Sequence, residues 1–151
     1  MIQRIQSVYL LIAACIQIAV FFLVWSSYFV DDQSFFLTGL ESSVGSISAM
    51  PLTLSIAVSI ALMLATLISF KNRASQMRLA NIVMLQLLLV FGIFGFAHYQ
   101  IIQTIKESFG QVEIGYGLAV ATPFISMILI WLAKKAIKKD DDLVKSVDRL
   151  R

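Results

Sequence analysis

The chain of 151 residues is 59% hydrophobic and 14% charged, with a mean hydropathy of +0.86 and a formal net charge of +3. Soluble domains carry about 25% charged residues, so this composition indicates a protein solvated mainly by lipid. The single cysteine, Cys15, excludes an intramolecular disulfide, and the single histidine, His98, excludes a multi-histidine metal site. We expect no metal and no cofactor. The basic residues flank apolar runs, which argues against nucleic acid as a partner.

Residues 8–30 are almost wholly apolar and long enough to cross a hydrocarbon core of about 30 Å as a helix. Tyr9 at the start of this run, with Trp25 and Tyr28 near its end, predicts an aromatic belt at each interface. Gln17 predicts a hydrogen bond to another helix, because an amide at mid-membrane depth needs a partner. Cys15 is interpreted as a small buried packing residue.

A cleaved lipoprotein is the competing interpretation of the same segment. Ile12-Ala-Ala-Cys15 resembles the lipobox at which bacterial lipoproteins are cleaved and acylated. A polar tether normally follows that cysteine, whereas here the apolar run continues through Trp25. We therefore favour an uncleaved helix.

Residues 31–50 form the longest segment outside the apolar runs. Their weak alternation, interrupted by glycine and serine, leaves a small external β-hairpin and an interfacial flap both open. Pro51 then predicts a helix start, because proline loses no intrahelical hydrogen bond in a first turn. The second predicted span covers residues 51–70. In it, Ser55 and Ser59 form a small-xxx-small pair that predicts close packing against another helix.

The third predicted span covers residues 79–99. One face of it, at helical spacing, predicts the contact with another helix and consists of Asn81, Leu85, Leu88, Gly92, Gly95 and Tyr99, with Gln86 as a further packing residue. A substrate path usually needs an ionisable group inside the membrane, and this span offers none. His98 is interpreted as a polar cap at the outer boundary, with a pH sensor as the alternative.

Residues 101–113 are predicted to be a second external connection that turns at Gly110. Its end, Gln111-Val-Glu-Ile114, is a candidate strand for pairing with the first external loop. The fourth predicted span covers residues 115–133. Pro123 lies in the middle of this span and predicts a kink, because it removes one backbone hydrogen bond and crowds the carbonyl of Ala119.

A basic break at residues 71–78 separates the second and third spans, and three cations there do not cross a bilayer cheaply. Both termini are therefore expected in the cytoplasm. The outside then holds one cation, Lys106, against five acids: Asp31, Asp32, Glu41, Glu107 and Glu113. The inside holds eleven cations: Arg4, Lys71, Arg73, Arg78, Lys134, Lys135, Lys138, Lys139, Lys145, Arg149 and Arg151.

Residues 134–151 form a predicted amphipathic cytoplasmic tail, separate from the transmembrane domain of residues 1–133. One helical stripe of the tail is mostly apolar, and charge lies elsewhere. Mixed charge beside an apolar seam favours a protein partner over anionic lipid, and a solvated continuation of the fourth helix is the alternative. The candidate docking residues are Ile137, Leu143, Val144, Val147, Leu150 and Arg149. Asp140-Asp-Asp142 is interpreted as a solvated acidic step, because nothing nearby completes a calcium shell.

Both ends of the chain carry a family resemblance. Met1-Ile-Gln-Arg-Ile-Gln-Ser-Val-Tyr-Leu-Leu11 and Ala136-Ile-Lys-Lys-Asp-Asp-Asp-Leu-Val-Lys-Ser-Val-Asp-Arg-Leu-Arg151 resemble an uncharacterised family of Bacteroidota, domain of unknown function 4293. The resemblance covers the whole chain and implies a protein of a Gram-negative inner membrane. It implies no activity, cofactor or catalytic residue.

These patterns predict an all-α membrane protein with four transmembrane helices in two antiparallel hairpins and a small periplasmic β element as an option. No nucleophile–base set, metal cluster or phosphate loop is present in the sequence, so we expect no enzyme. The leading hypothesis is an inner-membrane subunit or adaptor, in a homo- or hetero-oligomer, whose tail docks a partner protein. The alternative is a small oligomeric transporter or channel for an uncharged or lipid-like solute.

Overall fold

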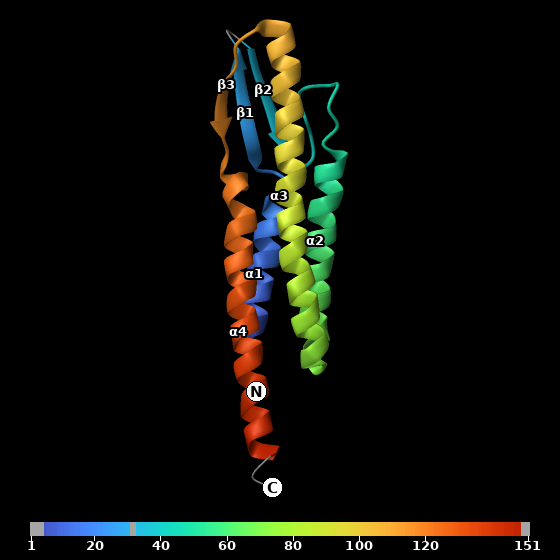
Figure 1. The fold of residues 1–151 in the computed structure, drawn as a ribbon, viewed down its shortest axis with the longest axis vertical. Coiled ribbons are helices and arrows are strands. Elements are labelled where there is room, and N and C mark those ends of the chain that lie inside the picture. The colour runs from blue at the N-terminus through green and yellow to red at the C-terminus, as the bar shows by residue number, and fades with distance from the viewer. Residues whose placement is uncertain (1–4, 31–32, 149–151) are drawn as a thin grey trace.

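The structure is a computed structural model that describes residues 5–30 and 33–148, with backbone alone at Lys71 and residues 143–148. The described chain is mostly helical and carries a small sheet at one end (Figure 1), which confirms a mainly helical fold with a small β element. Its elements, in order, are α1 (Ile5–Ala19), β1 (Val24–Val30), β2 (Gln33–Thr38), α2 (Met50–Ile68), η1 (Ser69–Lys71), α3 (Arg73–Phe109), β3 (Glu113–Tyr116), η2 (Leu118–Ala121) and α4 (Thr122–Asp148).

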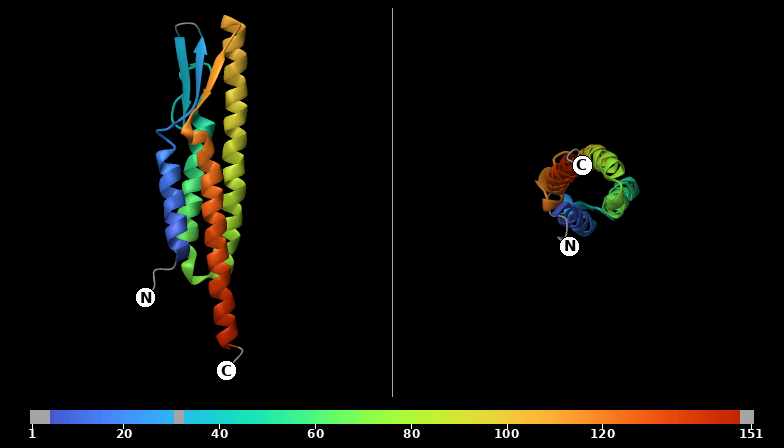
Figure 2. Two further views of the ribbon diagram at one scale, coloured as in Figure 1. Left: turned by 90° about the vertical axis from the view of Figure 1, so that its left-hand side faces the viewer. Right: turned by 90° about the horizontal axis from the view of Figure 1, so that it is seen from below.

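The helices pack side by side around a shared interior. α1 lies against α2 and α4, and α3 lies against the same two helices, so the four form a closed ring when seen along the long axis (Figure 2). Two apolar clusters fill the interior. The one among the four helices contains Leu10, Ala13, Ala14, Met63, Ala80, Val83, Leu87, Ile130 and Ala133. The other lies toward the sheet, where Trp25, Tyr28 and Leu37 pack beside Ile56, Val90, Phe94 and Ile101.

The α2–α3 hairpin follows the sequence pattern closely. Pro51 lies in the first turn of α2, which confirms it as a helix start. The basic break is divided between η1, which ends at Lys71, and the first turns of α3, which begins at Arg73. At Asn72, between them, the side chain accepts a hydrogen bond from the backbone of Ser75 at 3.1 Å. This cap satisfies an amide that the helix itself leaves unpaired. The helices can therefore reverse direction within a few residues.

α3 is longer than the predicted third span and is turned differently about its axis. Its 37 residues extend about 55 Å, from the α2–α3 turn to the far end of the sheet. The predicted contact face is wrong, because Leu85 and Tyr99 on it are 68% and 60% exposed. The buried face is Gln76, Ala80, Val83, Leu87, Val90, Phe94, Ala97, Ile101 and Ile105. A helix that is apolar all round gives no sequence signal for which face is covered.

The first apolar run divides into a short helix and a strand, so the predicted helix over residues 8–30 is wrong in its second half. α1 ends at Ala19, and β1 begins at Val24. A continuous apolar run fits a helix and a buried strand equally well, and the aromatic and β-branched residues of β1 favour the strand. Within the described residues, α2, α3 and the segment from Leu118 to Asp142 are long and apolar enough to cross a membrane, whereas α1 is shorter.

The sheet has the strand order β2-β1-β3, with both pairings antiparallel. Of the two structures considered for residues 31–50, a β-hairpin and an interfacial flap, the hairpin is the one present. It is formed by β1 and β2, and its first strand comes from the predicted first span. Residues 113–116 do form a strand, but it pairs with β1 and not with the segment after residue 30. Trp25 and Tyr28 are 0% exposed, which corrects their assignment to an interfacial belt. They face α3 from the covered side of the sheet.

Pro123 does not kink α4. The helix begins at Thr122, after the short η2, so the proline stands in its first turn and is buried. A first turn has no acceptor for the missing amide hydrogen, and the predicted kink is therefore wrong.

Two further predictions concern α3 and α1. Gly110 does end α3, with a φ of 86°, and Cys15 is exposed on α1 instead of buried.

Gly117 provides a test of the junction between β3 and η2. Its amide donates to the carbonyl of Trp25 at 3.0 Å, and a Cβ on it would overlap the carbonyl of Val24. Because both neighbours are backbone atoms, Gly117→Ala should lower the free energy of unfolding by about 1–3 kcal/mol. Thermal denaturation in detergent, followed by circular dichroism, measures this. Gly45→Ala, with open space around its Cβ, is the matched control, and equal melting of the two variants would contradict the packing described.

Candidate functional site

One buried polar contact joins the first and last helices. Gln17 Nε2 donates to Ser126 Oγ at 3.0 Å, and both residues are fully buried. This contact confirms the predicted interhelical hydrogen bond of Gln17. The other amide atom, Gln17 Oε1, has no hydrogen-bond partner among the described residues. The pair fixes the relative height of α1 and α4, since an amide and a hydroxyl must meet in an apolar interior.

A second polar contact joins α2 to α3. Gln86 Nε2 donates to the Ser55 carbonyl at 3.1 Å and lies 3.2 Å from Ser55 Oγ. Ser59 is buried one turn further and donates to the carbonyl of Ile56 in its own helix. These three predicted packing residues therefore lie between helices. Asn81, Gly92 and Gly95 are exposed, so the structure does not place them there.

A chain of hydrogen bonds links the sheet to α3. Ser26 Oγ donates to the hydroxyl of Tyr28 at 2.8 Å, and that hydroxyl lies 2.6 Å from His98 Nδ1. Because the Tyr28 oxygen accepts from Ser26, the phenol keeps its own hydrogen, which it can donate to a ring nitrogen of His98. Nε2 faces the Tyr116 hydroxyl at 3.4 Å.

His98 therefore connects β1, α3 and β3. Its interpretation as a polar cap at the outer boundary leaves these contacts out. Its ring also lies 5.5 Å from that of Phe94. No spacing pattern in the sequence indicates these contacts, since residues 28, 98 and 116 are distant along the chain. Only the histidine itself stood out in the sequence.

A charged contact joins α3 to α4 near the place where α4 extends past the other helices. Arg73 Nη1 donates to the carbonyl of Asp140 at 2.9 Å and lies 3.6 Å from Asp141 Oδ1. The acidic step is thus not merely solvated, because it contacts the first residue of α3. Among the described residues, no group of three potential metal-ligating side chains occurs.

Of the candidate docking residues, only Ile137 precedes this contact along the chain. Ile137 is 1% exposed and packs inside the chain itself, so in this structure it is not available to a partner. The backbone of α4 continues as a helix through Leu143, Val144 and Val147 to Asp148. Leu150 and Arg149 lie outside the described residues. Figure 1 shows this last part of α4 extending past the ends of the other helices.

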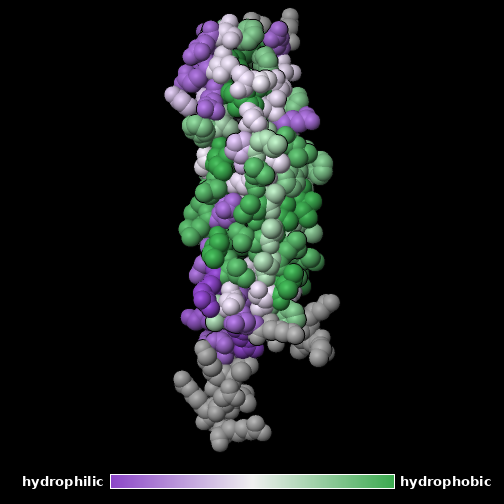
Figure 3. All heavy atoms as spheres, turned by 90° about the vertical axis from the view of Figure 1, so that its right-hand side faces the viewer, coloured by the Kyte–Doolittle hydropathy of each residue, from purple (hydrophilic) through white to green (hydrophobic). Residues whose placement is uncertain are grey.

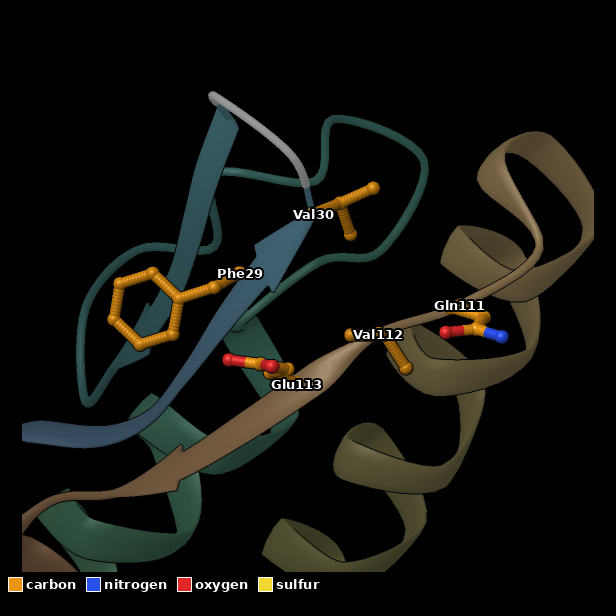
Figure 4. A pocket seen from close by; sticks show the side chains of 5 residues that line it. All are labelled: Phe29, Val30, Gln111, Val112 and Glu113. Carbon is orange, nitrogen blue, oxygen red and sulfur yellow. The ribbon is translucent and has the colours of Figure 1, made fainter.

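A pocket of about 290 Å³ opens at the opposite end of the molecule. It lies between the end of β1 and the connection from α3 to β3 (Figure 4) and is lined by Phe29, Val30, Gln111, Val112 and Glu113. None of the residues singled out from the sequence as a functional site lies in it. Its lining combines one carboxylate and one amide with apolar side chains, without a nucleophile or a base partner for chemistry.

A family model described as a domain of unknown function, DUF4293, matches residues 2–150. The chain belongs to this family. The match extends from α1 through α4, so the helices and the sheet together make up the DUF4293 domain. No curated protein and no solved structure matches the chain.

Removing the hydroxyl partner of Gln17 tests the contact between α1 and α4. Ser126→Ala should destabilise the fold by about 1 kcal/mol, because it leaves the buried amide unpaired. Adding Gln17→Leu should recover part of that loss, since both polar groups are then gone. Unfolding in a denaturing detergent measures each variant. Ser108→Ala, an exposed serine bonded within its own helix, is the control, and a double variant less stable than Ser126→Ala would contradict the pairing.

Arg73→Ala tests the contact that holds α4. Loss of the guanidinium removes its contacts with the carbonyl of Asp140 and the carboxylate of Asp141, so the last turns of α4 should open more often. Amide hydrogen exchange over residues 138–148, read by mass spectrometry, should become several-fold faster. Arg78→Ala removes an exposed cation from the same helix and serves as the control. Equal exchange in the two variants would show that the contact does not restrain α4.

Proposed function

We propose that this DUF4293 protein is a non-enzymatic subunit or adaptor of the bacterial inner membrane. The helical part anchors it in the bilayer, and the end of α4 docks a partner protein in the cytoplasm. One observation carries the proposal: α4 is a single helix that is packed inside the protein at its start and protrudes from it at its end (Figure 1).

The packing of α4 supports a rigid connection between anchor and docking segment. Ser126, Ile130, Ala133 and Ile137 are buried along one side of it, and Arg73 contacts it at Asp140 and Asp141. A further helical segment, to Asp148, follows without a break. Because no flexible linker intervenes, a partner bound there would be held at a fixed distance and orientation from the membrane.

The distribution of charge and hydropathy supports the proposed insertion and orientation. Hydrophobic residues cover the middle of the surface in Figure 3, and hydrophilic residues lie at both ends. Glu41, Lys106, Glu107 and Glu113 lie at the sheet end, whereas the cations of residues 71–78 and of α4 lie toward the other end. Cationic segments stay in the cytoplasm, which supports a cytoplasmic position for the protruding end of α4.

A second candidate function is the passage of a small uncharged solute. The observation that favours it is a set of buried amide atoms, Gln17 Oε1 and both side-chain polar atoms of Gln76, that have no hydrogen-bond partner among the described residues. Buried polar groups of this kind usually contact water or a ligand. Uptake of a labelled solute such as glycerol by vesicles containing the purified protein would favour this candidate.

Changing the stripe while keeping the helix tests the docking function. Val144→Asp with Val147→Asp places two carboxylates on the predicted apolar seam, so a partner that buries this seam should no longer co-purify with the protein from native membranes. Quantitative mass spectrometry of the purified complexes measures the loss. Deletion of Lys138–Arg151 should remove the same partner.

Lys145→Asp is the matched control, because it changes the net charge by the same amount as the double variant but lies off the seam. Partners should remain bound to it. Identical partners from the intact protein, the double variant and the deletion would contradict the docking function.

A further inference from the structure

The helix α1 is too short to cross a bilayer by itself. Its 15 residues extend about 22 Å, against about 30 Å for a hydrocarbon core. α4 begins only at Thr122, and the hydrogen bond between Gln17 and Ser126 places the outer ends of the two helices at one height. If the protein spans the membrane, as its proposed function requires, the β structure that follows α1 and precedes α4 begins below the outer surface of the hydrocarbon.

The height of the sheet above the basic break can be measured along the neighbouring helix α3, from its rise per residue. Sixteen residues, or about 24 Å, separate Arg78 from Phe94 on it. The ring of Phe94 lies 4.9 Å from that of Trp25, near the start of β1. His98, which contacts Tyr28, lies about 30 Å from Arg78 along α3, and this is about the thickness of the hydrocarbon core. The first rows of the sheet therefore lie within the outer leaflet, and its far end lies outside.

The surface at this height is apolar. Leu118 is 80% exposed and Phe22 76% exposed, and Phe96 of α3 is 64% exposed. The chain carries no charged residue from Ile5 to Val30 or from Ile114 to Ala133, and Glu113, which directly precedes the second run, stands at the far end of β3. Around Phe22 and Leu118 this apolar surface continues that of α1 and α4. The exposed Glu41 lies at the foot of β2, in the turn closed by Thr38 and beside the start of α2.

The backbone at this height is also paired as a lipid environment requires. β1 is the central strand and bonds to β2 on one side and β3 on the other. Gly117 donates to the carbonyl of Trp25, and the hydroxyls of Ser26 and Tyr28 are engaged with each other and with His98. Unpaired backbone groups are what excludes strands from hydrocarbon, and the central strand β1 is paired within the protein on both of its edges.

We propose that the acyl chains of the outer leaflet cover the foot of the sheet at Phe22 and Leu118, so that the sheet is partly embedded in the membrane. The inference rests on the proposed membrane insertion. It makes the lipid of the outer leaflet a direct ligand of the β structure. A second copy of the chain is the competing occupant of the same surface.

Spin labelling of the full-length chain in phosphatidylethanolamine–phosphatidylglycerol vesicles tests the proposal. Nitroxides are attached to Phe22→Cys and Leu118→Cys, each in a Cys15→Ser background. Collision rates with oxygen, which enriches in lipid, and with a water-soluble nickel chelate are then compared. Ile128→Cys, 60% exposed in the second turn of α4, is the lipid control, and Ser108→Cys, exposed at the far end of α3, is the aqueous control.

The labels at Phe22 and Leu118 should collide more with oxygen than with nickel, as at Ile128 and opposite to Ser108. Aqueous behaviour at both positions, with lipid behaviour at Ile128, would overturn the inference and leave membrane insertion intact. Aqueous behaviour at Ile128 as well would overturn the insertion itself. Labels shielded from both reagents and broadened by a second nitroxide would instead assign this surface to another copy of the chain.

Discussion

The fold depends on the pairing of β1 on both of its edges. Its partner β2 follows directly in the chain, whereas its other partner, β3, follows α3 and precedes α4. This second pairing joins the end of α1 to the start of α4 and makes those two helices neighbours. Tyr28 then meets His98, and Gln17 meets Ser126, because the strand holds both ends of the ring in register.

Polar side-chain contacts between the helices set their relative positions. Gln17 with Ser126 fixes α1 against α4, Gln86 with Ser55 fixes α3 against α2, and Arg73 holds α4 where it leaves the others. Apolar packing alone tolerates sliding between helices, since one aliphatic contact replaces another at little cost. A hydrogen bond in an apolar interior does not, because its loss leaves an unpaired group. The positions of helices in the ring, and the direction of the protruding end of α4, thus follow from a small number of side chains.

The sequence predicted correctly those features that have a local cause. Pro51 starts α2, Gly110 ends α3, and the basic break makes a tight turn, each because the residue itself limits the backbone. Gln17 was also predicted to bond to another helix, since an amide in an apolar run needs a partner. Its partner Ser126 was not predicted, because an isolated serine in a later helix carries no such signal.

Hydropathy and charge by themselves determined that long apolar segments alternate with charged ends, because composition and spacing are properties of the chain. Tertiary structure decided whether each apolar segment became helix or strand and which face it buried. Residues 24–30 fit either state, and the edges offered by β2 and β3 made them a strand. α3 is apolar on all sides, so its neighbours decided that Leu87 is buried and Leu85 exposed. Pro123 likewise stands in the first turn of α4 and not in mid-helix, because β3 and η2 occupy the chain up to Ala121.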